Sequence, residues 1–577
     1  WHEPMAKVAK VFQMALEPKP STVGVVVPVY NKKNLLERAV AEPQSSVGRI
    51  NLLTAEERLA LTDTWCIRET AYPRDRTVWE LFAEQADRQP DAVALIDAAN
   101  RCTYSQLCEQ AEQLAAALFN HGLKPGMRVG VCMERSPEWI AGLLAILALP
   151  AFAQDSETTN QILFQDVRVF DGVSDKLSGS TNVLVEDNTI KSISPDAKVS
   201  SGATVIDGGG RILMPGLIEA HSHLLLSGVS IPEVLFEQES YMQIQGANMA
   251  RDMLMNGVTT TRDMAGNIFG LKRAIDNGSV PGPRIYPSGA MISQTSGHGD
   301  FRLPVEQHRR WYGAVPATDR KMVGLQVDGV PEMLAATREQ LRYGASQIKL
   351  AIGGSVSGLN DPLDTTQFTH EEIEAAVTAA GDWGTYVTVH GYSPRAVNRA
   401  IDAGIKSVEH GQLLDEATLK RMAKEGIWLS IQPFTECHED SLTESQNAKQ
   451  AIVCEGTSKV YPMIKKMPKL KVVHGTDIFI SPGPGIGVSE QVEQMKRLLE
   501  WFTPYEILKM STGNATELLQ LSGPRNPYPG VLGRVQEGAL ADLLLVDGNP
   551  LEDLSAVTDK ANLLIIMKDG KIFKNTL

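Results

Sequence analysis

The stretch RILMPGLIEAHSH, residues 211–223, carries an apolar strand pattern that ends in a His-Ser-His triplet. Residues two apart on a strand point to the same side, so His221 and His223 can reach one metal ion. Two loop histidines would give the same triplet, because histidine is common near polar loops. The sequence that follows favours the metal site.

Downstream of this triplet, strand patterns alternate with helical patterns, which predicts a parallel α/β architecture. Helical patterns lie at residues 371–383, 416–426 and 489–502. Eight strand patterns lie at residues 211–221, 258–264, 284–289, 346–352, 385–390, 407–410, 428–434 and 471–477. Eight such units predict a TIM-type (β/α)8 barrel, whose active site lies at the C-terminal ends of the strands.

The other candidate ligands each lie on a strand of their own. His390 closes TYVTVH, His410 closes SVEH and Asp477 closes KVVHGTD. Lys349 lies within the apolar segment SQIKLAI, where a lysine is costly unless its charge is removed or paired. An ammonium group that extends to solvent is the alternative for Lys349. A barrel would bring these four side chains to the rim that carries the His-Ser-His triplet.

Short strand patterns also flank the barrel region on both sides. Residues 162–205 and 541–573 read as β-hairpins with Asp-Asn or Asp-Gly turns. We therefore expect one small β-sandwich built from residues 155–213 and 523–577, with the barrel at residues 214–522 between its two parts.

Taken together, these residues resemble the amidohydrolase superfamily, in the form with two metals bridged by a carbamylated lysine. They are similar to its Xaa-Pro dipeptidase and imidazolonepropionase-like branch, and most closely to the ochratoxin-degrading amidohydrolases. The similarity rests on MPGLIEAHSH (214–223), SGHGD (296–300), IKLAIGGSVSG (348–358), VEHG (408–411) and LADLLLVDGNPLEDL (540–554). One departure is Glu219, where many relatives carry Asp; it leaves the metal ligands in place.

The resemblance implies two divalent cations as cofactors, with zinc preferred over manganese or cobalt. It implies six ligands: His221, His223 and Asp477 for one ion, His390 and His410 for the other, and Lys349, carbamylated by CO2, as the bridge. A hydroxide shared by the ions is the expected nucleophile. Asp477 is the expected catalytic residue, which accepts the proton and delivers it to the departing nitrogen.

Two further residues are implied to contact the substrate. His298, in SGHGD, resembles a histidine that contacts the substrate carbonyl or its oxyanion, and otherwise caps local backbone. Tyr392 matches a position that contacts a substrate carboxylate, and otherwise packs as an aromatic. The implied activity is hydrolysis of an amide or peptide C–N bond in a dipeptide, an N-acyl amino acid or an ochratoxin A-like amide, by a homo-oligomer.

Three other functions remain open. A cyclic-amide hydrolase or a deaminase of the same superfamily is one; deaminases of this kind usually carry HxxE on the fifth strand, whereas residues 390–394 read HGYSP. A relative of these enzymes without catalytic activity is the second, although none of the expected metal ligands is missing. The third is an adenylate-forming enzyme, because residues 52–149 resemble a truncated adenylation domain of a nonribosomal peptide synthetase.

That N-terminal resemblance rests on long matching segments at residues 53–65, 72–97, 103–107 and 130–147. It ends before the glycine-rich phosphate loop and the nucleotide-contacting motifs, so we expect no adenylation chemistry. Residues 1–51 stay unassigned.

The two regions meet at WIAGLLAILALPAFAQ, residues 139–154. Its apolar run, a helix breaker at Pro150 and then Ala-Phe-Ala form the pattern of a secretory signal and cleavage site. This interpretation implies an exported hydrolase, mature from about Gln154 and located in the periplasm or outside the cell. The alternative is a buried helix of the synthetase-like piece, in a cytoplasmic protein.

Composition excludes some partners. The chain has 55 Lys plus Arg against 69 Asp plus Glu, a formal charge of −14, which argues against nucleic acid. No apolar run reaches the ~18–20 residues of a membrane span, so we expect no membrane partner. The expected partner is a small-molecule substrate. The six cysteines include no CxxC pair, which indicates neither a zinc knuckle nor a dense disulfide framework.

Overall fold

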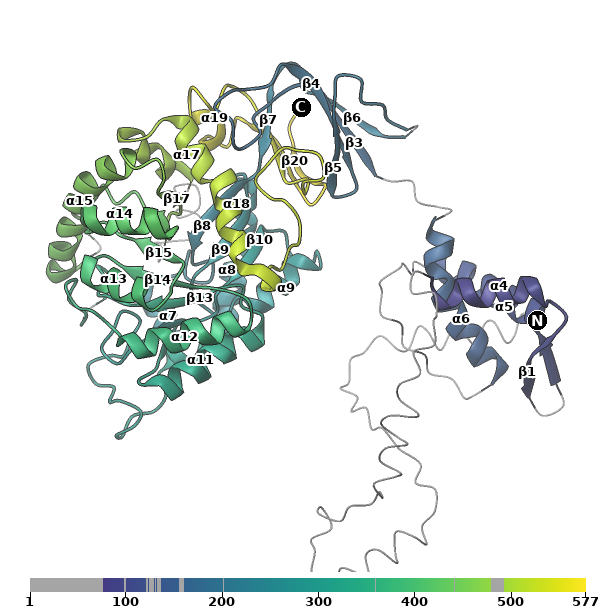
Figure 1. Cartoon of the computed structure of the whole chain (residues 1–577), viewed down its shortest axis with the longest axis horizontal. Coiled ribbons are helices and arrows are strands. Elements are labelled where there is room, and N and C mark those ends of the chain that lie inside the picture. Colours follow the sequence, from purple (N-terminus) through teal and green to yellow (C-terminus); the bar gives the residue numbers. More distant parts are fainter. Residues whose placement is uncertain are drawn as a thin grey trace, which may run out of the picture. The chain divides into compact units, whose positions relative to one another are not determined.

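The chain divides into two compact units, Trp1–Thr158 and Thr159–Leu577 (Figure 1). This computed structural model describes residues 76–97, 100–120, 136–154, 160–200, 202–358, 360–440, 442–478 and 492–577, with Leu123, Val129 and Val131. Residues 1–51 therefore lie outside the described residues. Among the described helices, none combines the length and the apolar character that crossing a membrane requires.

The first unit contains a small α/β fragment. Its elements are α4 (Val78–Arg88), β1 (Val93–Asp97), β2 (Asn100–Thr103), α5 (Tyr104–Asn120) and α6 (Pro137–Gln154). Strands β1 and β2 pair antiparallel. The N-terminus of α4 is fixed by a capping box, in which Thr77 and Glu80 bond each other's backbone N–H.

The segment predicted as a secretory signal forms helix α6. This helix continues through Pro150 to Gln154, so the prediction of a helix break at Pro150 is wrong. A proline removes one helical hydrogen bond, and the rest of the helix tolerates this loss here. Ala141, Ala145 and Ala148 are buried in the core of the first unit. This is the buried helix that the alternative interpretation predicts, and the cellular location stays a prediction.

In the second unit, strands from both ends share one mixed sheet, in the order β20-β19-β18-β7-β3-β4-β5, with β6 paired to β3. The strands are β3 (Gln161–Val169), β4 (Ser180–Glu186), β5 (Thr189–Ile193), β6 (Thr204–Asp207), β7 (Ile212–Pro215), β18 (Leu543–Val546), β19 (Leu563–Lys568) and β20 (Lys571–Asn575). Antiparallel pairing of β18 with β7 joins the two ends. A bridge between Thr189 and Leu540 brings edge strand β5 back beside the segment before β18, so the sheet encloses its own core.

The parallel strands are β8 (Leu217–Ser222), β9 (Val258–Asp263), β10 (Arg284–Pro287), β11 (Met291–Ser293), β12 (Gly324–Gln326), β13 (Ile348–Ala351), β14 (Val387–Gly391), β15 (Ser407–His410), β16 (Trp428–Ile431) and β17 (Lys471–His474). Each predicted strand is present, and the first is split at Gly216 between β7 and β8. A side chain at Gly216 would collide with Thr259, whose Oγ1 would lie 2.1 Å from an added Cβ. Strands β11 and β12 were not predicted, because each has only three residues.

Hydrogen bonding divides these strands into two parallel sheets, β10-β9-β8 and β12-β11-β13-β14-β15-β16-β17. The observed fold is therefore a mixed α/β fold. The pairing does not confirm the predicted closed barrel.

The second unit also contains helices, and those up to α15 connect the parallel strands and cover them (Figure 1). They are α7 (Ile231–Phe236), α8 (Glu239–Met255), α9 (Phe269–Asp276), α10 (Ala317–Arg320), α11 (Val330–Tyr343), α12 (His370–Asp382), α13 (Pro394–Asp402), α14 (Glu416–Glu425), α15 (Glu444–Lys465), η3 (Gln494–Glu500), α17 (Pro504–Met510), α18 (Gly513–Leu519), η4 (Gln520–Arg525) and α19 (Ser555–Thr558). Thr369, Asp415 and Thr443 cap α12, α14 and α15 by accepting backbone N–H bonds.

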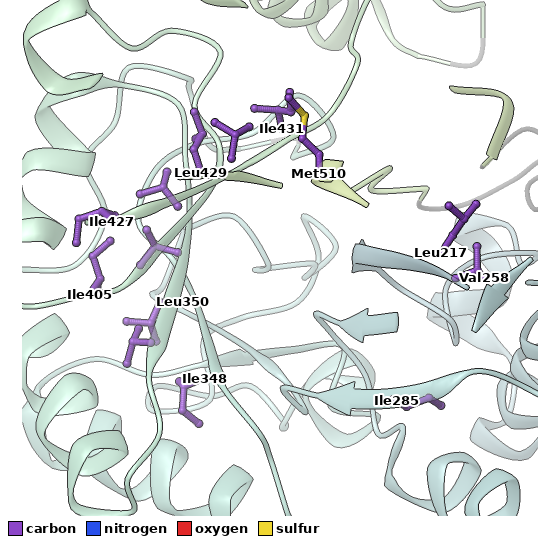
Figure 2. Packing of buried hydrophobic residues seen from close by; sticks show 14 of the residues in the cluster. Leu217, Val258, Ile285, Ile348, Leu350, Ile405, Ile427, Leu429, Ile431 and Met510 are labelled. Atoms are coloured by element: carbon purple, nitrogen blue, oxygen red, sulfur yellow. The ribbon is translucent and has the colours of Figure 1, made fainter. Parts of the chain in front are cut away.

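The largest core packs apolar strand residues such as Ile348, Leu350 and Leu429 together with residues of the covering helices (Figure 2). Because side chains alternate along a strand, burial of Ile348 and Leu350 in this core turns Lys349 to the opposite face. The apolar pattern of the strand thus determines where its one charged side chain points.

Candidate active site

The structure places five of the six predicted metal ligands at or shortly after the C-terminal ends of parallel strands, and the sixth, Lys349, within its strand. They lie at the end of β8 (His221) and just after it (His223), in β13 (Lys349) and β14 (His390), at the end of β15 (His410) and shortly after β17 (Asp477). All are buried except Asp477, whose side chain keeps 18% of its surface exposed. The carboxylate of Asp477 is therefore the part of this group most open to solvent.

The tightest group consists of His221, His223 and Asp477. The Oδ1 atom of Asp477 lies 3.0 Å from Nε2 of His223 and 3.2 Å from Nε2 of His221. One ligand atom from each of the three residues lies within 4.8 Å of the others. The predicted His-Ser-His triplet and the distant aspartate therefore converge on one point.

The chemistry of this group fits a cation. Nδ1 of His221 lies 2.8 Å from Oε2 of Glu409, and when Nδ1 donates its proton there, Nε2 keeps a lone pair that faces the carboxylate of Asp477. Two acceptor atoms 3.2 Å apart need a proton or a cation between them. Two imidazole nitrogens and a carboxylate oxygen form a ligand set that suits zinc and similar divalent ions.

His390 and His410 lie beside this group. Their ring centroids are 4.4 Å apart, and the ring of His410 lies 5.1 Å from that of His221. Nδ1 of His410 lies 3.8 Å from Oδ2 of Asp477 and bonds to Oε1 of Gln432 at 2.9 Å. Burial holds the pKa values of His390 and His410 well below the usual histidine range, so both rings are neutral and carry lone pairs.

Backbone conformation contributes to this convergence. His410 and Asp477 have φ angles of 79° and 55°, in the left-handed region that costs a residue with a Cβ about 1–2 kcal/mol. Strain of this kind collects at functional sites, where the surrounding structure enforces it. Here it occurs at two of the six candidate ligands.

Lys349 is buried with 1% of its surface exposed. Burial lowers its pKa to about 8, whereas the nearby charges of Glu409 and Asp477 act in the opposite direction. In the strand register, Lys349 is opposite Thr388, and Ala351 is opposite His390. The alternative of an ammonium group in solvent is therefore wrong, because the apolar neighbours of Lys349 direct it inward.

His298 and Tyr392 both border the histidine pair. The ring of His298 lies 4.2 Å from that of His390, and its Nδ1 lies 3.8 Å from Oδ2 of Asp361. Burial lowers the pKa of His298 to about 3, so this ring is neutral. The ring of Tyr392 lies 5.1 Å from His390 and 5.3 Å from His410, and Tyr392 also packs in an apolar cluster.

Sequence reasoning missed the residues that hold these ligands in place. Glu409 is fully buried and bonds to His221, while Nη2 of Arg262 lies 2.7 Å from Oε1 of Glu409. Gln432 was missed as the partner of His410. The available signal was weaker than for Lys349: Arg262 and Glu409 are charged residues within predicted strands, but the segments VTTTRDM and SVEH are mostly polar.

Glu219, the departure from the family pattern, has a structural role beside the ligands. Its Oε1 accepts hydrogen bonds from the backbone N–H groups of His221 and Thr476, both at 2.9 Å. It thereby ties the end of β8 to the segment that carries Asp477. Burial raises the pKa of Glu219 to about 7.

Comparison with known proteins separates the two units. Residues 82–153 match the model of the AMP-binding enzyme family. Malpinin synthetase of Mortierella alpina is 34% identical over 131 residues, which is 21% of this chain and only 2% of that protein. The first unit therefore corresponds to a small part of such synthetases.

The second unit matches most or all of the length of known hydrolases. Ochratoxinase of Aspergillus niger is 31% identical over 375 residues, covering 63% of this chain and 76% of that protein. The solved structure of a prolidase complexed with N-methylphosphonate-L-proline is 29% identical with a TM-score of 0.66, covering 72% of this chain and 100% of that one. The model of the amidohydrolase family matches residues 212–573, more than half of the chain. The chain therefore belongs to the amidohydrolase family and is a hydrolytic enzyme.

Proposed function

We propose that the second unit hydrolyses an amide or peptide C–N bond of a small molecule with the help of two bound divalent cations. The observation that carries this proposal is the convergence of His221, His223 and Asp477 on one point, directly beside His390 and His410. The first three would hold one ion, and the two other histidines would hold the second. Lys349 would join the two ions.

We also propose that the two parallel sheets belong to one (β/α)8 barrel. Backbone hydrogen bonds link the sheets at both sides: Asp477 N–H donates to His221 C=O at 2.9 Å, and Ser346 N–H donates to Pro287 C=O at 2.8 Å. In such a barrel, side chains at the strand ends face one common site. This arrangement would explain why candidate ligands from five different strands can meet.

Lys349 is suited to carbamylation. Burial brings its pKa to about 8, so a substantial neutral fraction exists near neutral pH and can add to CO2. In this reaction the neutral amine nitrogen forms an N–C bond to CO2 and releases one proton, which leaves an anionic carbamate in place of the amine. A carbamate offers two oxygen atoms, as a bridging carboxylate does.

The bound ions would supply Lewis acidity to the substrate carbonyl and would lower the pKa of water from ~15.7 to about 7. Asp477 is the residue that accepts a proton and delivers it to the departing nitrogen, because its carboxylate is the most exposed ligand. His298, neutral and beside His390, contacts the substrate carbonyl oxygen. Tyr392 provides a phenol group that binds a substrate carboxylate.

The names of the relatives guide the choice of substrates. One relative is named for ochratoxin, and the other is a prolidase that was solved with a proline derivative. These names support dipeptides, N-acyl amino acids and ochratoxin A-like amides as candidate substrates of this chain. We do not propose adenylation chemistry for the first unit, since its similarity covers only 2% of a synthetase.

The experiment that tests this proposal combines metal analysis with an activity screen of the full chain. The purified protein is supplied with zinc and bicarbonate and assayed against N-acyl-phenylalanines, X-Pro dipeptides, ochratoxin A and a lactam. We expect two ions per chain and hydrolysis of at least one linear amide. Cleavage of the lactam alone would favour a cyclic-amide hydrolase, and a chain without bound metal after reconstitution would refute the proposal.

A further inference from the structure

The segment between β16 and α15, residues 432–440, contributes two side chains to the candidate active site. Gln432 bonds to Nδ1 of His410 at 2.9 Å. Two residues later, the ring of Phe434 lies parallel to that of His410, with 6.3 Å between centroids. The position of this segment therefore determines what surrounds His410.

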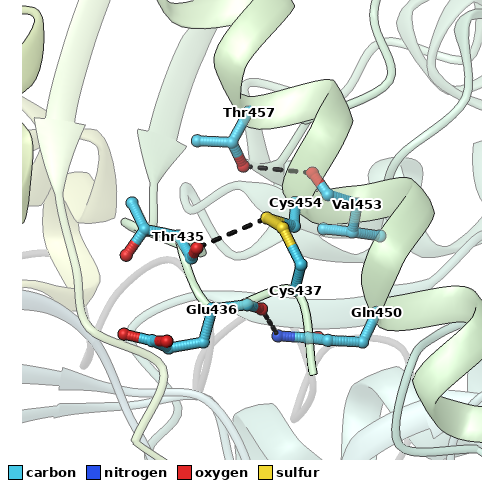
Figure 3. Close-up of a disulfide and its surroundings, with 7 residues drawn as sticks. All are labelled: Thr435, Glu436, Cys437, Gln450, Val453, Cys454 and Thr457. Carbon is cyan, nitrogen blue, oxygen red and sulfur yellow. Dashed lines mark hydrogen bonds between the residues drawn. A yellow bond between two sulfur atoms is a disulfide. The ribbon is translucent and has the colours of Figure 1, made fainter. Parts of the chain in front are cut away.

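Covalent and polar bonds tie the same segment to helix α15 (Figure 3). Cys437 and Cys454 form a disulfide with 5.2 Å between their Cα atoms. Gln450 donates from Nε2 to the backbone oxygen of Glu436 at 2.6 Å. A cross-link of this kind removes alternative conformations from a loop that would otherwise move freely.

The disulfide also lies next to an apolar surface at the active site. Leu363, Tyr392 and Val453 form a buried cluster, and the partly buried Val356, Leu413 and Phe434 pack against it. We call these six residues the apolar wall. Val453 precedes Cys454, and Phe434 lies three residues before Cys437, so the cross-link joins the two segments that carry these wall residues.

The apolar wall borders two of the candidate metal-binding histidines. The ring of Tyr392 contacts His390 and His410, and Phe434 contacts His410 from another element. Phe434 is only partly buried, so part of its aromatic surface stays accessible, and its ring lies beside that of His410. An apolar substrate group placed there would lose contact with water, which favours binding.

We propose that Phe434 is a specificity-determining residue that selects substrates with an apolar side chain, and that the Cys437–Cys454 disulfide positions it. The selectivity part rests on the proposed hydrolase function. Without the cross-link, residues 432–440 would have to become ordered each time a substrate binds, which weakens binding of the apolar group.

The first test measures position without activity. In the full chain, Cys437→Ser with Cys454→Ser removes the disulfide, and Cys102→Ser with Cys108→Ser is the matched control, because these are free cysteines of the first unit. Hydrogen–deuterium exchange is followed in residues 432–440. We expect exchange to accelerate at least tenfold in the first variant only; unchanged exchange would overturn the positioning role.

The second test measures selectivity as the ratio of kcat/KM for N-acetyl-L-phenylalanine to that for N-acetyl-L-alanine. We expect Phe434→Ala to lower this ratio at least tenfold through KM, and the disulfide-free variant to lower it in the same direction. Phe434→Leu keeps an apolar side chain, so this variant should retain part of the preference for N-acetyl-L-phenylalanine. An unchanged ratio in Phe434→Ala overturns the selectivity role. If the unaltered chain cleaves no amide, both the proposed hydrolase function and the proposed selectivity are refuted. The positioning role of the disulfide still stands in that case if hydrogen–deuterium exchange accelerates when the disulfide is removed.

Discussion

The guanidinium group of Arg262 and the carboxylate of Glu409 form an ion pair in which neither side chain is exposed to solvent. The pair connects strand β9 to strand β15, and its second carboxylate oxygen holds Nδ1 of His221 at 2.8 Å. Arg262 also donates to the backbone oxygen of Ala220 at 2.6 Å. One buried pair thus fixes both the backbone and the ring orientation at the first candidate ligand.

Replacing Glu409 by Gln should therefore destabilise the protein. The change leaves the charge of Arg262 buried and unpaired, which costs about 3–5 kcal/mol of unfolding free energy. Equilibrium urea unfolding measures the loss. Glu416→Gln, in an exposed pair with Lys420, is the matched control and should change stability by less than about 0.5 kcal/mol.

A double variant sharpens this prediction. Arg262→Met combined with Glu409→Leu removes both charges, and it should cost less than Glu409→Gln alone because no uncompensated charge remains. If the single and double variants behave alike, the pairing of the two charges is not what stabilises this part of the fold.

Asp477→Asn should reduce kcat by about 10²–10⁴-fold, the usual contribution of a general acid–base group. An amide oxygen can still face the histidines, so part of the metal should stay bound. Steady-state kinetics together with elemental analysis checks both parts. Asp402→Asn, at an exposed site on α13, serves as the control, and normal turnover in Asp477→Asn would exclude the proton-transfer role.

Lys349 gives a prediction about chemical rescue. Lys349→Ala removes the amine that reacts with CO2 and leaves space, so added propionate should restore part of the lost metal binding and activity. Lys349→Met fills the same space without an amine and should not respond. Metal content and initial rates with and without propionate distinguish the two variants, and equal responses would argue against a bridging carbamate.

Asp263 predicts a pH dependence of stability. Burial raises the pKa of this carboxyl to about 7, although backbone N–H groups of Leu224 and Ala265 oppose the rise. Since the unfolded chain loses this proton near pH 4, the folded state binds more protons between about pH 4 and 7, and stability falls as pH rises through this window. Asp263→Asn should remove a slope of up to about 1.4 kcal/mol per pH unit. Urea unfolding of metal-free protein at several pH values measures it, and an unchanged slope would contradict the assignment.

Much of the site was predictable from local sequence. His390, His410 and Asp477 each close a predicted strand, and the carboxyl ends of parallel strands meet at one edge. The inward direction of Lys349 follows from the alternation of side chains along β13. These features depend only on residues close together in the chain.

The supporting contacts were not predictable in this way. Glu409 and Arg262 are 147 positions apart, and Gln432 lies 22 positions from His410. The residues next to each of these positions in the sequence do not indicate which distant residue it contacts. The disulfide between Cys437 and Cys454 likewise depends on how residues 432–440 pack against α15.

The sequence by itself determined the chemical character of this protein: which side chains can bind metal, the strands that carry them, and the family they resemble. Tertiary structure alone decided how strands from both ends join in one sheet, how β11 and β12 enter the parallel sheet, and which buried charges are paired. The physical reason is that periodicity and turn chemistry act over a few residues, whereas pairing and burial depend on the packing of distant segments.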